Sequence, residues 1–149
     1  MKGLISDCKG GNVMDISTLI EDFLGQKIQS EAEVRSKLIV PLLELLGYSS
    51  NFRAEEFPVY GYEGGKALSA KKVDFLQFTS NGFDENRGKS DEELAWVYQH
   101  SLLVFEAKKP TERILVKGQP VFYSAWTRSI AYMISNGDII EGYIVNSSY

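Results

Sequence analysis

Residues 102–108 read LLVFEAK, an apolar run that ends in an acid and a base two positions apart. A nearly continuous apolar run of this length is typical of a strand in the middle of a sheet, covered on both faces. Side chains alternate along a strand, so Glu106 and Lys108 are expected to project from the same face. An ionised carboxylate at the end of a buried strand needs a partner, and a metal ion is a suitable one.

A second acid lies inside another strand pattern. Residues 71–78 read KKVDFLQF, which places Asp74 between apolar neighbours. Residues 52–59 have a similar pattern, and the glycine-containing residues 61–65 between them favour a turn, so a hairpin is the simplest arrangement. If the strand of Asp74 lies beside the strand of Glu106, the two acids meet at one place in the sheet.

Two carboxylates and a lysine at one sheet edge suit Mg²⁺-assisted hydrolysis of a phosphodiester. The metal would polarise the phosphoryl oxygen and lower the pKa of a bound water, while Lys108 orients that water or stabilises developing negative charge. Oxygen ligands without a cysteine cluster favour Mg²⁺, or Mn²⁺, over zinc. The same acids also fit an ordinary salt-bridge network with Lys71, Lys72 and Lys108, which would carry no chemistry.

Two helices are expected before the hairpin. Residues 15–24 place apolar side chains at helical spacing, and Gly25 favours a stop. Ser30 followed by Glu33 is a capping box, which predicts the start of a second helix that runs to about residue 46. Pro41 is expected to bend this second helix, because it cannot donate a backbone hydrogen bond.

The remaining chain predicts a loop, a helix and a short strand. Residues 79–93 are polar and contain two X-Gly pairs, which is typical of a loop. Residues 119–130 predict a helix, and residues 132–135 predict a short strand that ends at an Asn-Gly turn. The order of elements favours a mixed sheet with helices packed on its faces.

Composition places the chain among ordinary globular domains. It has 149 residues, 44% of them hydrophobic and 24% charged, which suits a single core. The one cysteine, Cys8, excludes an internal disulfide and a multi-thiolate zinc site, and a reducing cytoplasm fits best. No signal peptide or membrane span is visible. The net charge of -4 argues against coating nucleic acid by bulk positive charge, although basic residues gather between Lys108 and Arg128.

The helix that begins at the capping box resembles a known family. Residues 30–48 read SEAEVRSKLIVPLLELLGY, which looks like the opening helix of the N-terminal nuclease domain of type I restriction enzyme restriction (R) subunits. Members of that family continue with an Asp in a strand, a Glu-x-Lys after an apolar strand, a Gln-x-x-x-Tyr motif and a strand that ends in Asn-Gly. This chain has KVD at 72–74, FEAKKP at 105–110, QPVFY at 119–123 and MISNG at 133–137, in that order.

The resemblance implies the α/β fold of the PD-(D/E)XK nuclease superfamily, a central mixed β-sheet flanked by helices. In that fold Asp74 and Glu106 would hold Mg²⁺, Lys108 would be catalytic, and Glu31 would reach the site from the helix. Glu33 is the alternative helix acid, although its capping role makes it the weaker choice. Residues 1–29 would form an N-terminal helix and tail, and residues 30–149 the nuclease domain, within one globular unit.

The Gln-x-x-x-Tyr motif corresponds to Gln119 and Tyr123, which lie one helical turn apart and so share a face. The resemblance implies that they contact DNA or support the site, while the plainer interpretation makes Tyr123 a partly buried aromatic residue. Pro120 beside Gln119 departs from a regular helix start. Family members also carry an ATP-driven translocase after the nuclease, and this chain has no Gly-x-x-x-x-Gly-Lys phosphate loop.

The function implied is that of a Mg²⁺-dependent endodeoxyribonuclease domain in the cytoplasm, in a type I restriction-modification or related defence system. Its partners would be DNA, translocase domains, and specificity or methylation subunits, with no membrane involved. The chain would be either an N-terminal region of a longer subunit or a stand-alone relative. The alternative is a catalytically silent nucleic-acid-binding or assembly module with the same fold.

Overall fold

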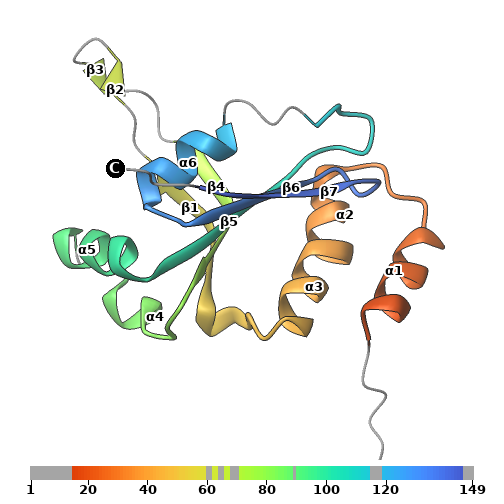
Figure 1. Ribbon diagram of the computed structural model, residues 1–149, viewed down its shortest axis with the longest axis horizontal. Helices are drawn as coiled ribbons and strands as arrows, with labels where there is room; N and C mark the ends of the chain where they lie inside the picture. The colour runs from red at the N-terminus through yellow and green to blue at the C-terminus, as the bar shows by residue number, and fades with distance from the viewer. Residues whose placement is uncertain are drawn as a thin grey trace, which may run out of the picture.

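The computed structural model describes residues 15–59, 62–63, 66–67, 71–88, 90–114 and 119–145. Helices and strands follow one another in a mixed order (Figure 1). The elements are α1 (Ile16–Leu24), α2 (Glu31–Val34), the π-helical η1 (Arg35–Ile39), α3 (Val40–Leu45), the 3₁₀ turn η2 (Ser50–Phe52), β1 (Arg53–Val59), β2 (Tyr62–Glu63), β3 (Lys66–Ala67), β4 (Lys71–Phe78), α4 (Phe83–Asn86), α5 (Ser90–His100), β5 (Ser101–Ala107), α6 (Gln119–Thr127), β6 (Ala131–Ser135) and β7 (Ile140–Ile144).

A mixed five-stranded sheet is the centre of the fold, in the order β1-β4-β5-β6-β7. β4 is antiparallel to both β1 and β5, β5 and β6 are parallel, and β7 is antiparallel to β6. α6 makes the crossover that a parallel pair requires. The expected hairpin of β1 and β4 is therefore confirmed, and so is the central position of the strand that carries Glu106.

Helices cover both faces of the sheet (Figure 1). Each face has its own apolar core. One core gathers side chains of α4, α5 and α6 with strand residues such as Val104 and Leu76. The other gathers side chains of α1 and of the continuous helix α2-η1-α3 with Phe75, Phe105 and Ala107. Because Leu19 of α1 is 3% exposed within this second core, α1 is packed into the same folded unit as the sheet.

The long helix begins as the sequence predicts. Ser30 caps it, with both hydrogen bonds of the capping box formed to Glu33. The helix does not stop or break at Pro41. Instead its hydrogen bonds widen to the π pattern across residues 35–39, so that the amide of Val40 donates to the carbonyl of Arg35. A π turn just before Pro41 gives the ring room, because Pro clashes with the carbonyl four residues before it in a regular α-helix.

The prediction of a loop over residues 79–93 was wrong. α4 and the first residues of α5 lie there, and Asp91, Glu92 and Glu93 occupy the first turn of α5. Acids in the first turn stabilise a helix through its macrodipole, so the polar composition that suggested a loop belongs to a helix start. The link between β1 and β4 also contains the small ribbon β2-β3 rather than a turn alone.

The C-terminal strand β7 was not anticipated either, and it pairs with β6 along the edge of the sheet. Cys8 lies outside the described residues. In the part of the chain that is described, no helix has the length and apolar character needed to cross a membrane.

Candidate functional site

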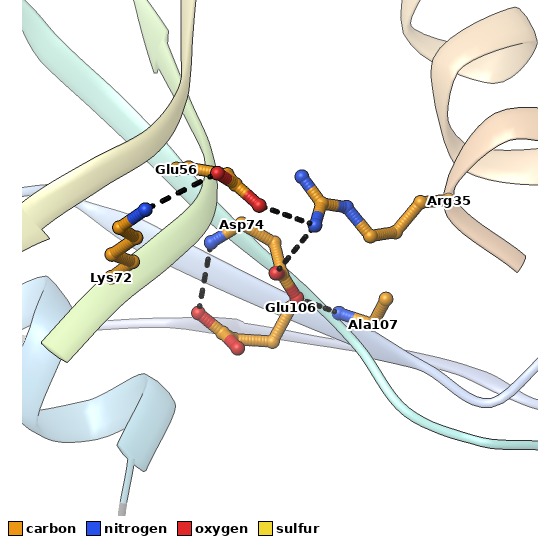
Figure 2. A network of polar contacts seen from close by, with 6 residues as sticks. All are labelled: Arg35, Glu56, Lys72, Asp74, Glu106 and Ala107. Atoms are coloured by element: carbon orange, nitrogen blue, oxygen red, sulfur yellow. Dashed lines mark hydrogen bonds and ion pairs between the residues drawn. The ribbon is translucent and has the colours of Figure 1, made fainter. Parts of the chain in front are cut away.

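β4 and β5 bring Asp74 and Glu106 together, as the sequence predicted. Phe75 and Phe105 are direct partners across the two antiparallel strands, and Asp74 and Glu106 are their immediate neighbours in the chain. The amide of Asp74 donates to Oε1 of Glu106 over 3.4 Å, and the amide of Ala107 donates to Oδ2 of Asp74 over 2.8 Å (Figure 2). The carboxylates therefore lie side by side on neighbouring strands, and Oδ1 of Asp74 is left facing the helix.

Glu106 is the unusual acid of this pair. Its side chain belongs to a residue that is only 3% exposed. Burial, and then the negative charge of Asp74, raise the pKa of Glu106 to about 8, against weaker opposing effects that include the charge of Lys108. A carboxyl group held in this way has an energetically costly ionised form, which an added cation would stabilise.

Glu31 and Lys108 belong to the same electrostatic environment. Burial raises the pKa of Glu31, and Asp74 raises it further, while Lys108 and Arg35 lower it. Lys108 also lowers the pKa of Glu106. Its position is fixed by its backbone amide, which donates to the carbonyl of Ser135 over 2.8 Å at the end of β6. The four predicted residues are thus close enough for their charges to act on one another.

Glu33, the alternative helix acid, is committed to the helix start. Its Oε2 accepts from the amides of Gln29 and Ser30, and its Oε1 pairs with Nζ of Lys37 at 3.0 Å. These contacts lower its pKa to about 2, with the amide of Gln29 as the largest cause. Glu33 is therefore occupied by capping, which leaves Glu31 as the helix acid nearest the two strand carboxylates.

Arg35 and Glu56 were missed by the sequence reasoning. Nη1 of Arg35 lies 3.5 Å from Oδ1 of Asp74 and 3.2 Å from Oε1 of Glu56, and Nζ of Lys72 lies 3.3 Å from Oε2 of Glu56 (Figure 2). A signal for Arg35 was present, because it follows Glu31 by four positions and so lies on the same helix face. The role of Glu56 depends on the hairpin register and carries no such local signal.

The salt-bridge alternative named three lysines as partners of the strand acids. Among the described residues, the ion pair of Asp74 is with Arg35 and the ion pair of Lys72 is with Glu56. Neither Asp74 nor Glu106 forms an ion pair within 4 Å with Lys71, Lys72 or Lys108 in the described part of the chain. The network therefore differs from the one that the alternative required.

The Gln-x-x-x-Tyr pair lies on α6. The backbone of Gln119 begins the helix, and its side chain lies outside the described residues. Tyr123 is fully buried in the core under α6, so it has no surface with which to touch DNA. A supporting role for Tyr123 stays a prediction.

The two strand carboxylates suit a hard divalent cation that takes only a few of its ligands from the protein. No group of three or more His, Cys, Asp or Glu side chains within the described ranges is gathered so that it could hold a metal ion. Asp74 and Glu106 are a pair, and Mg²⁺ is commonly bound by one or two carboxylates while water and substrate phosphate complete its octahedron. The observation in favour of such a cation is that the carboxyl of Glu106 is buried beside the negative charge of Asp74.

Comparisons of the chain with protein-family models, with curated proteins and with solved structures found no match in any of the three.

Proposed function

We propose that this chain is a Mg²⁺-dependent endodeoxyribonuclease domain with a PD-(D/E)XK fold, working in a type I restriction or related defence system. One observation carries the proposal. Two carboxylates on adjacent strands are held together by backbone amides, and one of them is buried beside the other's charge. The mixed sheet with helices on both faces supports the fold assignment.

The residues of this chain would divide the work as follows. Asp74 and Glu106 would hold the metal, which when bound polarises the phosphodiester and acidifies a water. Lys108 would place its ammonium beside the reacting phosphate and stabilise the negative charge that develops there. Glu31 would add a further acceptor from the helix, to orient the water. Translocase, specificity or methylation partners and a cytoplasmic setting belong to the same proposal.

A cleavage assay tests the proposal directly. Supercoiled plasmid is incubated with the protein in Mg²⁺ or Mn²⁺, and nicked and linear products are measured over time. We expect wild-type protein to cleave, and Asp74→Ala or Lys108→Ala to lower the rate on the order of 100-fold or more. Asp84→Ala is the matched control, since Asp84 is an exposed acid of α4 whose ion pair is with Arg87.

Circular dichroism accompanies the assay, because neither substitution should unfold the domain. If both site variants cleave as fast as wild type, the assignment of the site is wrong. If wild-type protein binds DNA but never cleaves it with either metal, the silent binding module replaces the nuclease.

A further inference from the structure

Arg35 faces the oxygen of Asp74 that accepts no backbone hydrogen bond from the described residues. Oδ2 of Asp74 accepts from the amide of Ala107, whereas Oδ1 lies 3.5 Å from Nη1 of Arg35. The side chain of Arg35 is 21% exposed, and its guanidinium lies 5.2 Å over the ring of Phe75. The cation is therefore packed against the sheet at the site rather than extended into solvent.

Some N–H donors of the Arg35 guanidinium are not used by the described residues. Nη1 serves both Asp74 and Glu56, and Nε and Nη2 have no hydrogen-bond acceptor among the described residues. Figure 2 shows the second terminal nitrogen of Arg35 pointing away from both carboxylates. A guanidinium that keeps such donors can bind a phosphate group through two parallel hydrogen bonds.

Glu56 holds the guanidinium of Arg35 in place, and its own backbone is strained. It lies on β1 opposite Asp74, between the paired positions of Glu55 and Phe57, and its φ is 51°. This left-handed conformation is unfavourable for a non-glycine residue, and such backbone strain is concentrated at functional sites. The carboxylate reaches both Arg35 and Lys72 from that position.

We propose that Arg35 binds the scissile phosphate of the DNA substrate, and that Glu56 is a positioning residue that holds the guanidinium in place for it. The inference rests on the proposed nuclease function and names a substrate contact within it. Arg35 already lies beside the carboxylate of Asp74, so a phosphate group held at these carboxylates would meet the unused N–H donors of the same side chain.

The first experiment measures binding to a mixed-sequence DNA duplex in a Lys108→Ala background, in which cleavage is expected to be slow, over a series of NaCl concentrations. Arg35→Gln should weaken binding about 10-fold or more and lower the slope of log K against log salt by about 1, the effect of losing one phosphate contact. Arg35→Lys should keep the slope, because it keeps the charge. Lys37→Gln is the control, since Lys37 lies on the same helix and pairs with Glu33.

The second experiment measures cleavage in the otherwise wild-type protein. Arg35→Gln should lower kcat on the order of 100-fold, and Arg35→Lys should restore only part of it, because Lys cannot form the two-point contact. Glu56→Gln should leave the salt slope unchanged and lower kcat about 10-fold, as expected for a misplaced guanidinium. A merely electrostatic Glu56 would instead give tighter DNA binding and unchanged cleavage.

Binding of Mn²⁺, followed by calorimetry, separates the remaining outcomes. Arg35→Gln should bind Mn²⁺ at least as tightly as wild type, because a neighbouring positive charge is removed. If Arg35→Gln loses Mn²⁺ binding, Arg35 acts by holding Asp74 and the phosphate role is overturned. If wild type cleaves and Arg35→Gln matches it in rate and salt slope, this inference alone fails. If wild type neither binds nor cleaves DNA, the proposed function fails and this inference with it.

Discussion

A single buried carboxyl, Glu106, sets the electrostatics of the site. Desolvation and the charge of Asp74 raise its pKa to about 8, so in the metal-free protein it holds its proton through neutral pH. In the unfolded chain the same group ionises near 4.5. Between these two pH values the folded state binds a proton that the unfolded state has released.

This difference predicts a pH-dependent stability. As pH rises from about 4.5 to about 8, the free energy of unfolding of the metal-free protein should fall, with a contribution from Glu106 of up to about 1.4 kcal/mol per pH unit. Glu106→Gln removes this contribution and should flatten the profile. Urea unfolding in EDTA, followed by tryptophan fluorescence at several pH values, measures both slopes. Parallel profiles for the two proteins would contradict the raised pKa.

The positive φ of Glu56 leads to a second prediction for a single residue. At an ordinary strand position Gly is less stable than Ala by roughly 0.5–1 kcal/mol. At a φ of 51° the order should reverse, so that Glu56→Gly is more stable than Glu56→Ala by about 1 kcal/mol. Both variants lose the same ion pairs, which isolates the effect of the backbone. Chemical denaturation measures the free energy of unfolding of the two variants. If Glu56→Ala is as stable as Glu56→Gly or more stable, the backbone at Glu56 is not strained.

Among the elements, the long helix α2-η1-α3 matters most to the site, because it carries Glu31 and Arg35. Its start depends on the capping box of Ser30 and Glu33. Ser30→Ala should lower the free energy of unfolding by about 1 kcal/mol, the usual effect of losing a cap. Thermal unfolding with Ser36→Ala as a control, an exposed serine of the same helix, tests it.

The pKa of Glu33 gives this cap a pH signature. Because its folded pKa is lowered to about 2 from a usual value of 4.5, its stabilisation should be present above pH 4.5 and be lost as pH falls toward 2. The difference in thermal midpoint between wild type and Glu33→Gln should therefore shrink across that window. A difference that stays constant down to pH 2 would show that the carboxylate is not the stabilising group.

Local sequence signals predicted several elements well, and the reason is physical. The capping box and the stop at Gly25 satisfy backbone groups within a few residues, and the strand with Glu106 is indicated by its own continuous apolar run. Arg35 and Glu56 were not predicted because their contacts depend on long-range structure. β1 must pair with β4, and the long helix must pack against both strands. The start of α5 was missed because acids in a first helical turn look like a loop when composition alone is considered.

At the scale of the whole molecule, the protein should gain stability from the cation that it is proposed to bind. At a free Mn²⁺ concentration of about 100 times Kd, linkage adds about 2.7 kcal/mol, which corresponds to a rise in thermal midpoint of roughly 5–10 °C. Asp74→Asn should abolish the rise and Asp84→Asn should keep it. A midpoint that Mn²⁺ leaves unchanged in wild type would argue against a cation site.

The π turn in the long helix also has a consequence for how the chain length can vary. A π turn holds one residue more than the α-helix it interrupts, while the segments on either side keep their faces. Removing exposed Ser36 and replacing Pro41 would thus give a plain α-helix in which the acid at 31 still faces the sheet. A one-residue deletion elsewhere in the helix would instead rotate the residues before the deletion by about 100° around the helix axis. Natural variants one residue shorter are therefore expected to lose that residue between 35 and 39.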